Sequence, residues 1–97
     1  MSAPNLLAAI QSANEVIDIA HAMETPLRGL LPGLRCDTGE ARADHELGVR
    51  ATAIGFITLA AAGVIAAFSP SPARVEALQA LLLAKESAER AARLEQH

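Results

Sequence analysis

The feature that most constrains this chain is a long alanine-rich segment near its centre. No charged residue occurs between Ala51 and Ala73, and a stripe with steps of four and three runs from Ala43 to Phe68. These steps match the period of an α-helix that turns one side toward a neighbour. The segment therefore predicts a long central helix over residues 38–69.

Prolines on either side of this segment delimit two further helices. Pro26 disfavours helical geometry at the residue before it, which predicts a first helix over residues 4–25. Ser71 can cap a third helix over residues 72–95, and Pro72 suits its first turn. The connection at 26–37 contains prolines, glycines and four leucines, and we expect it to pack over the end of the helices.

Together the helices predict a single all-α domain over residues 1–97. Its architecture is expected to be a three-helix bundle or a long helical hairpin around the central helix. From about residue 84 the stripe of the third helix consists of alanines among charged residues, which predicts a charged helical extension.

The composition favours association with another chain. The sequence is 52% hydrophobic but only 2% aromatic, and much of the apolar share is alanine, which buries little area per residue. Small domains with a thin core often gain stability by forming oligomers. We therefore expect a homo-oligomer.

Two surfaces are predicted on the central helix. The first is a bulky interaction seam, and the second is a close-packing face of small residues that would let another backbone approach. The seam residues are Leu47, Arg50, Ile54, Ile57, Val64 and Phe68, and the close-packing residues are Ala51, Gly55, Ala62 and Ala66.

Arg50 is the charged interruption of the seam, and two interpretations of it remain open. The guanidinium can pair with Glu15 or Asp18 or reach the edge of the seam while its stem packs. Alternatively, it fixes the register or the choice of partner, as polar seam residues do in coiled coils.

No catalytic motif accompanies the helices, so we expect a protein that is not an enzyme and that has no cofactor. One metal site is conceivable: an antiparallel pairing of the first two helices would bring Asp18 and His21 opposite Asp44 and His45, which are residue types that bind zinc or iron. Solvated polar side chains beside the seam are the simpler interpretation. The single cysteine, Cys36, excludes an internal disulfide and fits a reducing compartment.

These observations predict a small helical interaction protein that self-associates and binds another protein in the cytoplasm. A net charge of −3 without a basic stripe argues against nucleic acid as a partner. The alternative prediction is a small membrane protein of the holin or membrane-accessory type, with residues 51–69 spanning the bilayer as one helix.

Overall fold

The structure is a computed structural model that describes residues 3–23, 27–36 and 48–95; the side chains of 3–7, 48–51 and 95 lie outside this description. Every regular element in these ranges is a helix, so the all-α prediction is confirmed for them. The helices are α1 (Ala3–Met23), α2 (Leu31–Leu34), α4 (Gly48–Ala67) and α5 (Pro72–Glu95). The predicted start of the central helix, including Ala43 and Leu47, lies outside the described residues.

The helix ends follow local sequence signals. Ser71 caps α5 as predicted, because its Oγ accepts a hydrogen bond from the backbone N–H of Arg74 at 3.1 Å. Its carbonyl also accepts the N–H of Val75, which closes the first turn. Helix α4 ends two residues before the predicted boundary.

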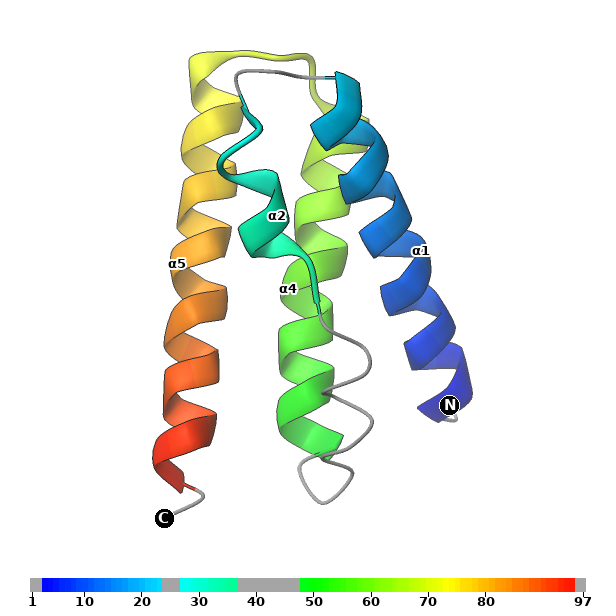
Figure 1. The fold of residues 1–97 in the computed structure, drawn as a ribbon, viewed down its shortest axis with the longest axis vertical. Coiled ribbons are helices and arrows are strands. Elements are labelled where there is room, and N and C mark those ends of the chain that lie inside the picture. The colour runs from blue at the N-terminus through cyan, green and yellow to red at the C-terminus, as the bar shows by residue number, and fades with distance from the viewer. Residues whose placement is uncertain (1–2, 24–26, 37–47, 96–97) are drawn as a thin grey trace.

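Three long helices lie side by side, with α4 between α1 and α5, while α2 lies over α4 in the space between the two outer helices (Figure 1). Helices α1 and α4 run in the same direction, and α5 runs in the opposite direction. The antiparallel pairing of the first two long helices is therefore wrong. That pairing assumed a turn at the end of the bundle, whereas residues 27–36 run back beside the long helices for part of their length.

The returning segment, residues 27–36, supplies much of the core. Leu27, Leu31 and Leu34 are buried, so the expectation that these leucines pack against the helices is confirmed. Their position differs from the prediction, because they lie between the long helices and not over an end.

The core is thin and purely aliphatic. It consists of seven buried residues, with valine, isoleucine and leucine side chains from α4, α5 and the turn before α2 packed around them; the seven are Ile17, Ala20, Leu27, Leu31, Leu34, Ala61 and Leu78. Neither phenylalanine belongs to it, since Phe56 and Phe68 are both exposed.

Gly55 and Gly63 of α4 have different surroundings, so alanine substitutions at the two positions should have different effects on stability. A Cβ at Gly55 would lie 2.5 Å from Cδ1 of Ile10, whereas a Cβ at Gly63 would meet nothing within 4 Å. Gly55→Ala is expected to lower the free energy of unfolding by about 1–3 kcal/mol, because Ile10 must move within a packed core. Gly63→Ala should raise it by up to about 1 kcal/mol, because alanine favours helix. Urea denaturation of both variants measures this difference, and equal effects would contradict it.

Candidate interaction surface

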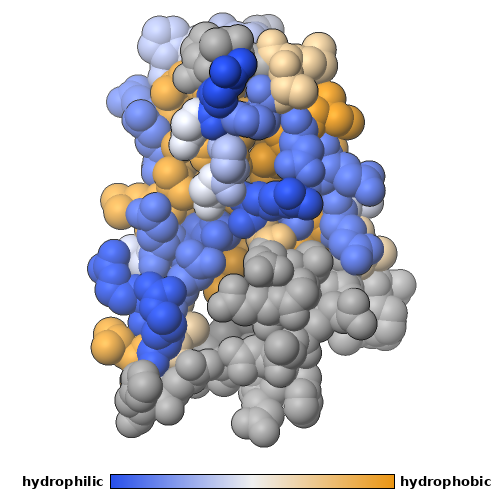
Figure 2. Space-filling model, viewed as in Figure 1, coloured by the Kyte–Doolittle hydropathy of each residue, from blue (hydrophilic) through white to orange (hydrophobic). Residues whose placement is uncertain are grey.

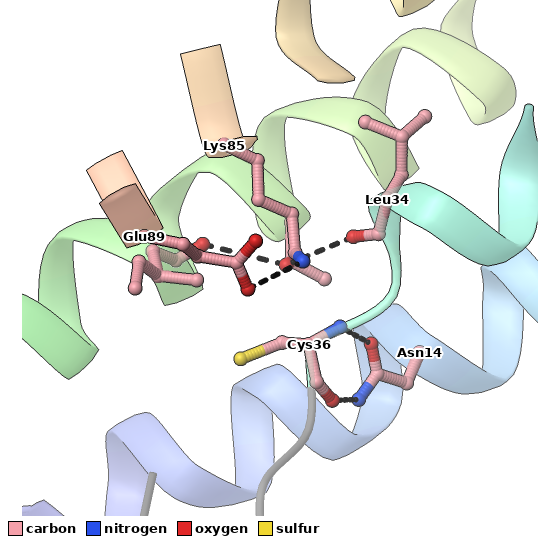
Figure 3. A network of polar contacts seen from close by, with 7 residues as sticks. Asn14, Leu34, Cys36, Lys85 and Glu89 are labelled. Carbon is pink, nitrogen blue, oxygen red and sulfur yellow. Dashed lines mark hydrogen bonds and ion pairs between the residues drawn. The ribbon is translucent and has the colours of Figure 1, made fainter. Parts of the chain in front are cut away.

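A polar junction holds the returning segment against α1. The side-chain amide of Asn14 donates to the carbonyl oxygen of Cys36 at 2.5 Å, and its oxygen accepts the N–H of Cys36 at 2.8 Å (Figure 3). Asn14 and Cys36 are both buried. The amide of Asn14 therefore acts like a neighbouring peptide group and satisfies both backbone polar groups of Cys36 at a place that contains no regular helix.

Thr58 joins the same segment to α4. Its hydroxyl lies 3.2 Å from the carbonyl oxygen of Leu34 and 3.4 Å from that of Ile54, within its own helix. Thr58 is fully buried, and donating its proton to these carbonyls keeps the hydroxyl satisfied in an apolar core. Thr58 therefore fixes which side of α4 the returning segment covers.

Helix α5 contributes a buried cation at the same level of the bundle. Nζ of Lys85 lies 2.9 Å from Oε2 of Glu89, one turn later in α5, and only 8% of the Lys85 side chain is exposed. Figure 3 shows this pair beside Leu34 and the Asn14–Cys36 hydrogen bonds. The pair neutralises the one cation of the charged C-terminal half of α5 that is buried in the described structure.

The described residues do not form the metal site that the sequence suggests. Asp18 lies 3.5 Å from the guanidinium of Arg35, and both side chains are about half exposed. Asp44 and His45 lie outside the described residues, and the antiparallel register that would bring them to Asp18 is wrong. In the part of the chain that the structure describes, no three metal-ligating side chains come together.

The predicted seam is only partly buried. Ile54, Ile57 and Val64 are half-buried, and Phe68, just beyond the end of α4, is 62% exposed. Leu47 lies outside the described residues, as does the side chain of Arg50, so its two interpretations stay predictions.

The predicted close-packing face is also only partly buried. Gly55 and Ala62 are buried, Ala66 is exposed, and the side chain of Ala51 lies outside the description. The buried side of α4 thus lies between the two predicted surfaces and is centred near Thr58. Sequence reasoning missed Thr58 because a polar residue does not mark an apolar stripe.

The exposed side of α4 forms a continuous uncharged stripe. It lies about half a turn away from Thr58 and so faces away from α2. Its residues follow steps of three and four and are Ala53, Phe56, Ala60, Gly63 and Ala67. We call this set the α4 outer stripe.

The neighbouring helices extend this uncharged surface. In α1, Val16 and Met23 are exposed on the flank opposite Asp18, which faces Arg35 of the returning segment. In α5, the side chain of Leu82 lies against Gly33, and the exposed alanines about half a turn away, Ala80 and Ala84, point away from α2. The surface formed by these four residues (Val16, Met23, Ala80 and Ala84) and the α4 outer stripe is called the distal face.

Charged residues gather on the other side of the molecule. In α5, Glu86, Glu89 and Arg93 share the side of Leu82, because they follow it at helical steps of four, seven and eleven. Figure 2 views the α2 side, where hydrophilic residues cover much of the surface. The residues of the distal face are all uncharged, and Glu76 borders them one helical turn before Ala80 in α5.

Comparisons with models of protein families, with curated proteins and with solved structures find no match to this chain. Among the described helices, none has both the length and the apolar character needed to cross a bilayer, so the alternative prediction of a span at 51–69 gains no support.

The Asn14 junction predicts a large loss of stability on truncation. Asn14→Ala removes the two hydrogen bonds that Asn14 makes with the buried backbone of Cys36, and we expect the free energy of unfolding to fall by about 2–4 kcal/mol. Gln11→Ala, at an exposed position of α1, is the control and should change it by less than about 0.5 kcal/mol. Chemical denaturation measures both variants, and a loss at Asn14 no larger than that at Gln11 would show that the junction does not hold the segment.

The Lys85–Glu89 pair predicts opposite outcomes for two substitutions. Glu89→Gln leaves a buried cation without its counter-ion and should destabilise the protein, by about 1–2 kcal/mol because the carboxylate is partly solvated. Lys85→Met removes the charge but keeps the packing, so its stability should stay within about 1 kcal/mol of the parent. Thermal denaturation at matched concentration tests this order, and a larger loss in Lys85→Met would reverse the interpretation.

Proposed function

We propose that this chain is a non-catalytic helical interaction protein that self-associates through its distal face and also binds another protein. The observation that carries the proposal is Phe56, a large aromatic side chain that is 58% exposed on the uncharged α4 outer stripe. Fully burying a phenylalanine contributes about 1.5–3 kcal/mol, and covering the exposed part of Phe56 would contribute about half of that. Aromatic side chains are also enriched where proteins bind one another.

The distribution of polar groups supports the same function. The buried polar side chains Asn14, Thr58 and Lys85 bond within the molecule, so they serve the fold. The distal face, in contrast, combines exposed apolar side chains from three helices with no charged residue. Extended uncharged surfaces of this kind are typical of protein interfaces.

The thin core supplies a second reason for association. It contains no aromatic side chain from the described residues, and two of its seven members are alanines, so burial within one copy of the chain yields limited stability. A partner on the distal face would cover further apolar area, including Phe56 and Val16, and would thereby stabilise the folded state by mass action.

A charge placed at Phe56 should prevent self-association. We expect Phe56→Glu to raise the dissociation constant of the oligomer about tenfold or more, because an interface cannot readily bury an uncompensated carboxylate. Leu94→Glu is the matched control: Leu94 is 71% exposed and lies ten residues beyond Ala84 in α5, outside the distal face. Sedimentation velocity over a range of concentrations gives the oligomeric state of each protein. A parent protein that stays monomeric at high concentration would refute self-association, and equal effects of the two variants would exclude the distal face.

A further inference from the structure

Gly63 has no structural role within the described part of one chain. It lies in the second half of α4, is exposed, and has open space where a Cβ would be. Glycine inside a helix costs about 1 kcal/mol relative to alanine, and this cost is explained when another group must approach the backbone closely. Gly55, in the same helix, illustrates such an approach, because the side chain of Ile10 occupies the space that its Cβ would fill.

Phe56 is the protruding counterpart of this open position. Both residues belong to the α4 outer stripe, and Phe56 precedes Gly63 by two helical turns, a rise of about 10 Å. Between and beyond them the stripe contains only alanines: Ala53, Ala60 and Ala67. The stripe thus has one large side chain and one gap, placed almost symmetrically about Ala60.

This symmetry makes the stripe complementary to itself. When two copies of α4 pack in opposite directions about a twofold axis near Ala60, Phe56 of each copy lies opposite Gly63 of the other. Ala53 then lies opposite Ala67, and Ala60 lies near its own counterpart. The steps of three and four along the stripe suit the shallow crossing angle of closely packed helices.

We propose that the occupant of the distal face is a second copy of this chain, bound with α4 antiparallel to α4 and with Phe56 inserted over Gly63 in both directions. This inference rests on the proposed function and specifies its partner and register. The extents of the molecule, 39 × 26 × 19 Å, allow a broad face of about 1,000 Å². Specific complexes bury about 800 Å² on each partner, so one broad face is large enough to hold an interface of ordinary size.

A double-mutant cycle on dimerisation tests the contact between Phe56 and Gly63. Gly63→Leu fills the gap, and Phe56→Ala removes the side chain that enters it; each is expected to raise the dimer dissociation constant about tenfold. In the combined variant, the leucine introduced at position 63 occupies the space that Phe56 leaves, so the dissociation constant should be lower than that of either single variant. Gly63→Leu is not expected to unfold the monomer, because no atom lies within 4 Å of the added Cβ and leucine favours helix.

Disulfide cross-linking tests the direction of the two helices. Ala60→Cys should form a disulfide-linked dimer on oxidation, because residue 60 faces its own counterpart near the axis. Ala53→Cys, on the same stripe and also exposed, should not, because it faces residue 67. The parent protein controls for Cys36, whose side chain is buried.

The outcomes separate this inference from the proposed function. A parent protein that remains monomeric would refute self-association and the dimer with it. A dimer in which the two substitutions have additive effects, or in which Ala53→Cys links as readily as Ala60→Cys, would overturn only the antiparallel register.

Discussion

The fold depends on the way residues 27–36 return along the bundle. This short segment contributes three buried leucines, and hydrogen bonds from Asn14 of α1 and Thr58 of α4 hold its backbone in place. Because the segment travels back along the helices, α1 and α4 can run in the same direction although they are neighbours. Without it, the apolar sides of α1, α4 and α5 that now contact its leucines would face solvent.

This arrangement gives the molecule two unlike surfaces. On one side, the returning segment covers the junction of the long helices, and hydrophilic residues cover much of the surface there. On the other side, α4 lies between its neighbours with nothing from the described residues over its outer stripe. A single short segment can cover only one side of three adjacent helices. The uncovered side is therefore where a partner can add the most buried apolar area.

The glycines at positions 55 and 63 of α4 have different roles. Gly55 allows Ile10 to pack against the helix backbone within the molecule, while Gly63 leaves an open position on the surface. Side-chain size also differs between the interior and the surface. The buried apolar side chains are small or aliphatic, whereas the aromatic Phe56 is exposed. The stability of the monomer explains the first glycine but neither the second nor the exposed phenylalanine. The antiparallel dimer that we propose accounts for both.

The sequence alone determined the helical class, the cap at Ser71 and the start of α5 at Pro72, because these depend on local hydrogen bonding and backbone geometry. Tertiary structure decided the direction of α1 and the buried side of α4. Apolar residues occur on every side of α4, so hydrophobic periodicity cannot select one of them. The selection comes from the leucines of 27–36 and from the hydroxyl of Thr58, which meet only in the folded chain. As a result, the predicted seam is partly covered, and the distal face emerges on the opposite side.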